Sequence, residues 1–257
     1  MTSAVEVLIP HMAPFLMVAF RLGGLFMFAP MFGSSVLPMR VKVLLALALA
    51  VCVYPGIPAQ SGPPMTLITL PIVLGSEMLI GIAIGYAASL PLLAMQIGGQ
   101  MMGHQLGLGL AHVFNPEFNE QVEVLSQFLF LVALAAFLLL NGHHALLHAL
   151  ASSFHAVPLG GYAPDGGLVA LTVGMLSASF ELGVRVAAPL LCLIFLETIA
   201  MGFVARTVPQ LNILSLGFPL RITLGLFLLI GLVAMMFTTF GDAMTTMLNR
   251  LVFAFSP

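Results

Sequence analysis

The chain has 257 residues, of which 61% are hydrophobic and only 6% are charged. A water-soluble domain of this length needs a far more charged surface, so this composition indicates an integral membrane protein or a subunit covered by similar partners. The net charge of −2 argues against nucleic acid as a partner, because phosphate binding needs a clustered basic surface. Cys52 and Cys192 lie in apolar runs, where they read as small core residues.

Apolar segments follow one another along the chain, at residues 14–32, 43–54, 65–97, 124–140, 168–204 and 220–240. Segment 43–54 is short of the roughly 20 residues that a full span needs. Pro71 and Pro91 are predicted to break segment 65–97, and the stretch TVPQLNILSLGFP predicts a second irregular break. We therefore expect an all-α membrane or membrane-complex protein of broken helices and helical hairpins, with about five to six apolar segments. Complete crossings and re-entrant hairpins both fit this pattern.

The last residues, Asp242 to Phe255, predict an amphipathic tail. Its apolar side chains recur at helical spacing, at Met244, Met247, Leu248, Leu251 and Phe255. One apolar face of this kind is typical of a helix at the membrane interface or against a partner.

Six ionisable residues lie within the apolar segments: Arg21, Glu77, Glu181, Arg185, Glu197 and Arg221. Each would cost roughly 2.5–3.5 kcal/mol at the centre of a membrane helix, so each needs a partner or a function. Glu181 and Arg185 are four residues apart and can pair on one helix face. An ion or proton pathway and structural pairing between helices or subunits are the two interpretations, and we favour pairing.

The histidines do not predict a metal centre. His144 and His148 have the spacing of a helical metal pair, with His143 beside them, but two histidines supply too few ligands. The chain contains no nucleophile-elbow, phosphate-loop or dinucleotide-binding motif. We expect no catalytic residue, no metal and no cofactor.

The central stretch 100–127 differs from the segments on either side. It is rich in glycine and holds three of the nine acidic residues, yet its middle is apolar. Met101 and Met102 are predicted to end one helix, after which the glycines make the backbone permissive. An apolar loop hinged by glycine fits a plug or seal that gates by excluding water. The residues assigned to this seal are Met101, Met102, Gly103, Leu106, Gly107, Leu108, Gly109, Leu110, Val113 and Phe114.

The next helix is predicted to begin where this loop ends. Asn115 is a candidate N-cap, Pro116 suits the first helical position, and Glu117 and Glu120 lie near the positive end of the helix dipole. Glycines at four-residue spacing, at Gly81 and Gly85 and again at Gly99, Gly103 and Gly107, predict close helix approach. That spacing fits packing within the chain and a contact between subunits equally well.

Several motifs resemble one known family over about residues 14–235. They are RLGGLFMFAPMFGSSVLPMRVKVLLALALA, GGQMMGHQLGLGLAHVFNP, VLSQFL, NGHHALLHALASSF, PLG and PQLNILSLGFPLRITLGL. In order and spacing they resemble FliR, the R component of the flagellar type III export gate, whose virulence-secretion counterpart is SctT.

The resemblance implies a non-enzymatic, pore-forming subunit of the bacterial inner-membrane export gate, in the flagellar basal body. It implies FliP-like, FliQ-like and FlhB-like partners, unfolded exported proteins as substrates, and contact with membrane lipid. It also implies that residues 1–165 form a P-like hairpin part containing the plug loop, at about 103–120. Residues 166–257 would form a Q-like hairpin with the amphipathic tail.

Two other functions stay open beside this one. A virulence type III export gate would use a closely related subunit. A small-molecule transporter would use the buried charges and predicts an inverted internal repeat, for which the two halves give no convincing sign.

Overall fold

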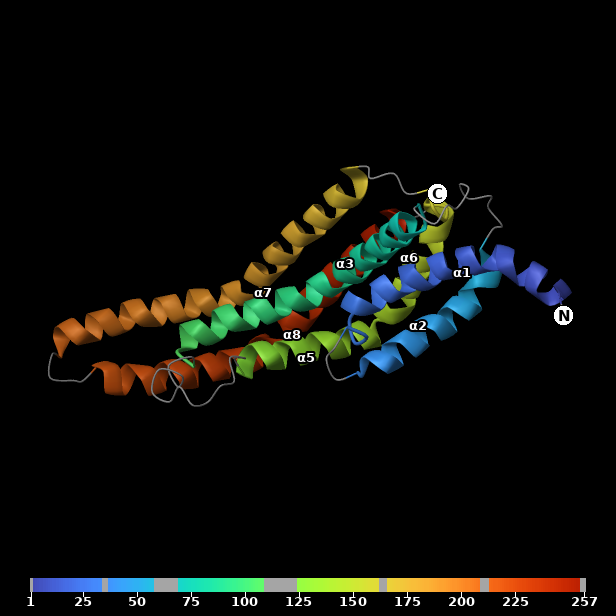
Figure 1. Cartoon of the computed structure of the whole chain (residues 1–257). Helices are drawn as coiled ribbons and strands as arrows, with labels where there is room; N and C mark the ends of the chain where they lie inside the picture. Colours follow the sequence, from blue (N-terminus) through green and yellow to red (C-terminus); the bar gives the residue numbers. More distant parts are fainter. Residues whose placement is uncertain are drawn as a thin grey trace. The chain divides into compact units, whose positions relative to one another are not determined.

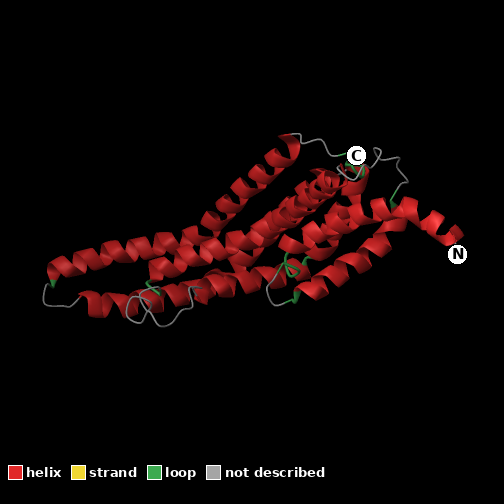
Figure 2. Cartoon of the chain, in the orientation of Figure 1, coloured by secondary structure: helices red, strands yellow, loops and turns green. Residues whose placement is uncertain are grey.

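A computed structural model describes residues 2–33, 37–57, 69–108, 124–161, 166–208 and 213–254. The regular elements in these ranges are all helical (Figure 2). The α-helices, labelled in Figure 1, are α1 (Thr2–Phe28), α2 (Met39–Val53), α3 (Thr69–Leu106), α5 (Val124–Leu139), α6 (Gly142–Ala156), α7 (Gly166–Thr207) and α8 (Ile213–Ala254). A short 3₁₀ helix, η1 (Tyr54–Gly56), extends α2. The predicted all-α class is confirmed.

Five helices are long and apolar enough to cross a membrane, and a sixth span is counted if α5 and α6 together form one. The predicted five to six apolar segments are therefore confirmed. Segment 43–54 is longer than predicted, because α2 and η1 together give an apolar stretch from Met39 to Gly56. Helices α5 and α6 are bent by 66°, just after the end of the apolar segment 124–140. Asn141 makes this bend in the left-handed conformation, with φ 54°.

The long helices are less broken than the sequence indicated. Pro91 lies inside α3, Pro189 inside α7 and Pro219 inside α8, and each helix continues through its proline. The predicted break at Pro91 is therefore wrong, and the second irregular stretch is shorter than predicted because α8 begins at Ile213. Apolar helices tolerate proline where neighbouring groups satisfy the freed backbone.

The chain forms two compact units that alternate along the sequence. Unit 1 comprises Met1–Leu90, Asn141–Leu176 and Thr245–Pro257, and unit 2 comprises Pro91–Leu140 and Ser177–Met244. The core of unit 1 includes Met17, Leu22, Leu25, Ile80, Ile84 and Phe154, and that of unit 2 includes Leu129, Phe137, Leu190 and Phe240. The predicted boundary between the P-like and Q-like parts, at 165–166, lies inside the segment Asn141–Leu176 of unit 1, so the two units do not coincide with the two predicted parts.

The C-terminal tail does not offer its apolar face to a partner. Met244, Met247, Leu248 and Leu251 are all buried within the chain, so the predicted interfacial face is already covered. Phe255 lies outside the residues that the structure describes. The residues of the apolar face were predicted correctly, but the surface that covers this face was not, because helical spacing alone does not say what a face packs against.

Other apolar surfaces stay uncovered. Only 11% of the α2 window, 28% of the α7 window and 17% of the α8 window are buried inside the chain. Cys52 and Cys192, expected in the core, are exposed on α2 and α7. Surfaces this apolar need lipid or another subunit against them.

Candidate functional site

Unit 1 encloses a buried ion pair between two of its helices. Arg21 of α1 and Glu77 of α3 both have fully buried side chains, and Arg21 Nε donates to Glu77 Oε2 at 2.6 Å. The two residues are 56 positions apart in the sequence. An isolated charge at this depth would be costly, and the pairing offsets part of that cost for both groups.

The same guanidinium also binds the end of α6. Arg21 Nη1 donates to the carbonyl and the hydroxyl of Ser153, at 2.9 and 3.1 Å, and Nη2 donates to the carbonyl of Val157 at 3.1 Å. The Ser153 carbonyl lies in the last turn of α6 and also accepts the helical bond from the Val157 N–H, whereas the Val157 carbonyl lies just past the helix end. A positive charge is favourable at this end of a helix. The ring of Phe154 lies 4.3 Å from Arg21 Cζ, as a cation–π contact.

The carboxylate of Glu77 holds the turn that follows α6. Its Oε1 accepts a hydrogen bond from the backbone N–H of Gly160 at 2.9 Å. Gly160 has φ 72°, and Gly161 N–H bonds back to the carbonyl of Pro158. A turn with a left-handed third residue favours glycine there, which explains the PLG motif. Arg21, Glu77, Ser153 and Gly160 thus join α1, α3 and the end of α6 into one polar cluster.

Glycines bring α1 and α3 close enough for this cluster to form. A Cβ on Gly81 would overlap the carbonyl oxygen of Arg21, and one on Gly24 would overlap that of Met78. A Cβ on Gly85 would lie 2.6 Å from the carbonyl oxygen of Leu25. The Gly81 and Gly85 spacing therefore serves packing within the chain.

Unit 2 contains two further ion pairs among the residues that the structure describes. Arg221 Nε of α8 lies 3.1 Å from Glu197 Oε2 of α7, and Arg221 Nη2 donates to Thr198. The second oxygen of Glu197 is buried, and no described residue forms a hydrogen bond with it. Arg185 and Glu181 pair at 2.7 Å along α7, but both side chains are more than half exposed. The two residues expected to pair on one helix face therefore do so, at an exposed position in the single chain.

The central stretch begins at a well-defined helix end. Helix α3 continues past Met101 and Met102 to Leu106, so the predicted helix end at the two methionines is wrong. Leu108 N–H bonds to Gly103 carbonyl and Gly107 N–H to His104 carbonyl, both at 3.1 Å. Gly107 has φ 79°. Together these are a Schellman motif, which ends the helix because the left-handed residue turns the chain away.

Packing within unit 2 fixes both sides of the central loop. Leu106 is fully buried, and a Cβ on Gly225 of α8 would overlap its side chain. On the other side, a Cβ on Gly99 of α3 would lie 2.6 Å from the Cα of Ser126, near the start of α5. The chain therefore leaves α3 and returns to it in α5. Met102 is buried beside this stem, whereas Met101 is partly exposed.

Four of the ten residues assigned to the seal lie outside the residues that the structure describes: Gly109, Leu110, Val113 and Phe114. The predicted helix start, with Asn115, Pro116, Glu117 and Glu120, lies outside them as well. The described part comprises Met101 to Leu106 on the helix, then Gly107 and the half-buried Leu108.

The histidines after the bend stack rather than converge on a metal. The rings of His143 and His144 lie 4.3 Å apart, and His148 contacts Ser152. Within the described ranges, no three side chains of histidine, cysteine, aspartate or glutamate lie close enough to hold a metal ion.

Sequence reasoning missed the members of the unit 1 cluster that come from α6 and its turn. Ser153 lies 132 positions from Arg21, and helical spacing cannot connect residues so far apart. The available signal was that RLGG, NGHHALLHALASSF and PLG belong to one set of motifs. Those motifs supply Arg21, Ser153 and Gly160.

Comparison with known proteins gives a consistent result. The family described as "Bacterial export proteins, family 1" matches residues 12–247. Flagellar biosynthetic protein FliR of Escherichia coli K12 is 32% identical over 79% of this chain and 78% of its own length. FliR of Bacillus subtilis 168 is 31% identical over 92% of this chain and 94% of its own. FliR of Caulobacter vibrioides is 30% identical over 81% of this chain and 84% of its own. Since the match spans nearly the whole chain, this protein belongs to the FliR family of bacterial export proteins.

Proposed function

We propose that the chain is a pore-forming subunit of the flagellar type III protein export gate. It would act in the bacterial inner membrane, at the flagellar basal body, without catalytic activity. Family membership supports the export role, and the relatives' name, flagellar biosynthetic protein, favours the flagellar system over the virulence system. Five apolar helices of spanning length support a membrane location.

The central loop, at about 103–120, is the proposed seal. The observation that supports it best is the stem: Gly107 ends α3 in a defined way, Leu106 packs against Gly225, and Gly99 packs against Ser126. A loop with fixed ends can hold apolar residues such as Leu110 and Phe114 at one place. Side chains of this kind close a narrow channel by excluding water from it.

The partners proposed are FliP-like, FliQ-like and FlhB-like subunits, with unfolded proteins as the exported substrates. The exposed apolar faces of α2, α7 and α8 support such an assembly, because a single chain leaves them uncovered. The division into a P-like part, 1–165, and a Q-like part, 166–257, belongs to the same proposal.

The seal can be tested without disturbing its stem. In the full chain, co-expressed with its partner subunits, the apolar loop residues Leu108, Leu110, Val113 and Phe114 are replaced by serine. We expect membranes containing this complex to leak ions and a small dye, because water then wets the closed channel. Leu106 and Gly107 stay unchanged, so the helix end is kept.

The matched control replaces polar residues of the same loop, Glu117→Gln with Glu120→Gln, and should leave permeability low. Size-exclusion chromatography of the purified complex shows whether each variant assembles. If the serine variant assembles and its membranes stay as tight as the wild type, the loop is not the seal.

A further inference from the structure

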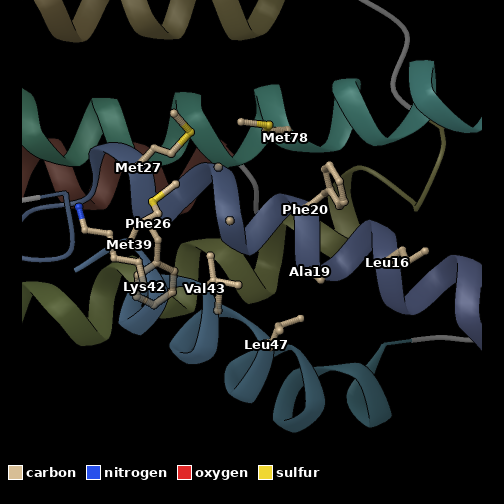
Figure 3. Close-up of a pocket in the computed structure, with 13 residues that line it drawn as sticks. Leu16, Ala19, Phe20, Phe26, Met27, Met39, Lys42, Val43, Leu47 and Met78 are labelled. Carbon is tan, nitrogen blue, oxygen red and sulfur yellow. The ribbon is translucent and has the colours of Figure 1, made fainter. Parts of the chain in front are cut away.

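A groove in unit 1 lies between α1, α2 and α3 and is separate from the polar cluster and from the central loop. Its volume is about 600 Å³. Its lining residues come from α1 between Leu16 and Met27, from α2 between Met39 and Leu47, and from Met78 of α3 (Figure 3). This size falls within the range of about 300–1,000 Å³ that is common for small-molecule sites.

The groove has one charged end. Lys42 is the single charged residue among the 13 that line it, and its amine lies beside Met39 at the start of α2, whereas Leu16 and Leu47 line the other end (Figure 3). Arg40 is exposed on the same turn. Helix α2 has no acidic residue in its first turn and no side-chain cap, so the two cations add to the positive end of the helix dipole. Among the described residues, no carboxylate forms an ion pair with Lys42.

The groove is also lined by two candidate membrane spans. Its α1 residues fall within the candidate span His11–Phe28 and its α2 residues within Met39–Gly56. A ligand that reaches it from the bilayer must be apolar along most of its length and negative at one end. We propose that this groove binds an anionic phospholipid, with an acyl chain along the apolar lining and the phosphate at Lys42.

Charge complementarity favours a lipid over a polypeptide helix. Basic positions at the ends of membrane helices attract anionic head groups, at about 1 kcal/mol per residue. A helix from another subunit would cover the apolar lining but would leave Lys42 without a counter-charge unless it carried an acid at that level. Every anionic glycerophospholipid carries a negative head group that can serve as the counter-charge of Lys42.

Gly23 provides a steric test. It lines the groove, and a Cβ built on it meets nothing within 4 Å, so a side chain can begin there without a clash. We expect Gly23→Leu to occupy part of the groove. Gly75 of α3 is the matched control, since it is equally open, is exposed and does not line the groove. For the charge, Lys42→Gln is matched by Arg250→Gln, which removes an exposed cation elsewhere in unit 1.

The experiment measures lipid retention by the purified full-length chain. Protein in detergent is equilibrated with phosphatidylglycerol or phosphatidylcholine, and bound lipid is counted by native mass spectrometry. A photoactivatable phosphatidylglycerol then maps the bound chain to tryptic peptides. We expect phosphatidylglycerol to be preferred, Lys42→Gln to lower that preference about fivefold, and Gly23→Leu to remove the bound lipid. Both control variants should behave like the wild type.

Other outcomes would overturn the assignment. These are equal retention of the two lipids by the wild type, an unchanged preference in Lys42→Gln, or unchanged retention in a folded Gly23→Leu. Circular dichroism and size-exclusion chromatography establish that folding. The chain co-expressed with its partners is tested in the same way, and cross-links from the groove to another subunit in place of lipid identify a polypeptide as the occupant. The leak assay of the loop reports on a different part of the chain, so either proposal can fail alone.

Discussion

Glu77→Gln should destabilise unit 1 strongly, although it changes one atom. The amide keeps an oxygen for the Gly160 N–H, but its NH₂ group would face Arg21 Nε, at the position where the carboxylate now accepts a 2.6 Å hydrogen bond. The guanidinium then stays fully buried with an uncompensated charge. Removing one member of a buried pair costs about 3–5 kcal/mol.

This cost should lower the midpoint of thermal unfolding by at least about 6 °C, at roughly 2–4 °C per kcal/mol for a chain of this size. The assay is thermal unfolding of the purified chain in detergent, followed by size-exclusion chromatography. The matched control is Glu181→Gln, which breaks an ion pair whose side chains are both more than half exposed. An exposed pair contributes at most about 1 kcal/mol, so the control should shift little.

A double-mutant cycle decides whether the loss belongs to the pair. Arg21→Met with Glu77→Leu removes both charges, and the double variant should be much more stable than the sum of the single losses predicts. The pair does not couple α1 to α3 if the stability losses of the two single variants simply add up to that of the double variant. The same conclusion follows if Glu77→Gln has the same midpoint of thermal unfolding as the wild type.

Three glycine and asparagine positions give further predictions. Gly81→Ala places a Cβ against the Arg21 carbonyl and should cost about 1–3 kcal/mol in the same thermal assay, whereas the open Gly75→Ala should be neutral or stabilising. A stable Gly81→Ala would contradict the close approach of α1 and α3. Gly107→Ala, at φ 79°, should cost about 1–2 kcal/mol and speed hydrogen exchange at the Leu108 amide, and unchanged exchange would argue against the Schellman end. Asn141→Gly, at φ 54°, should be tolerated and Asn141→Ala should be destabilising, and the reverse order would refute a left-handed bend there.

The sequence was sufficient for the fold class because composition and segment length decide it. Helix ends were harder to predict. Proline was expected to break α3, but Pro91 lies inside it, since packing in an apolar setting overrides the local preference. The two methionines were read as an end, while the real end depends on Gly107 and the hydrogen bonds to Gly103 and His104.

Pairing of charges shows the same limit. Glu181 and Arg185 can be matched from their spacing, and the structure places them together on an exposed face. Arg21 and Glu77 can be recognised as buried charges, but their partnership depends on how α1 packs on α3. The additional acceptors at Ser153 and Val157 depend on a third segment, more than 130 positions away from Arg21.

The Arg21 cluster has a consequence for how the chain is made. Translation supplies its members in order: the guanidinium of α1 first, the carboxylate of α3 next, and the α6 carbonyls with the Gly160 amide last. Until residue 160 has left the ribosome, the charge pair has only itself, and one carboxylate oxygen and three guanidinium hydrogen bonds await acceptors or donors. Packing of α6 and its turn against α1 and α3 supplies these bonds. The cluster can therefore be complete only when the early and middle segments of unit 1 are both present, whereas the last segment of that unit, Thr245–Pro257, is synthesised after it.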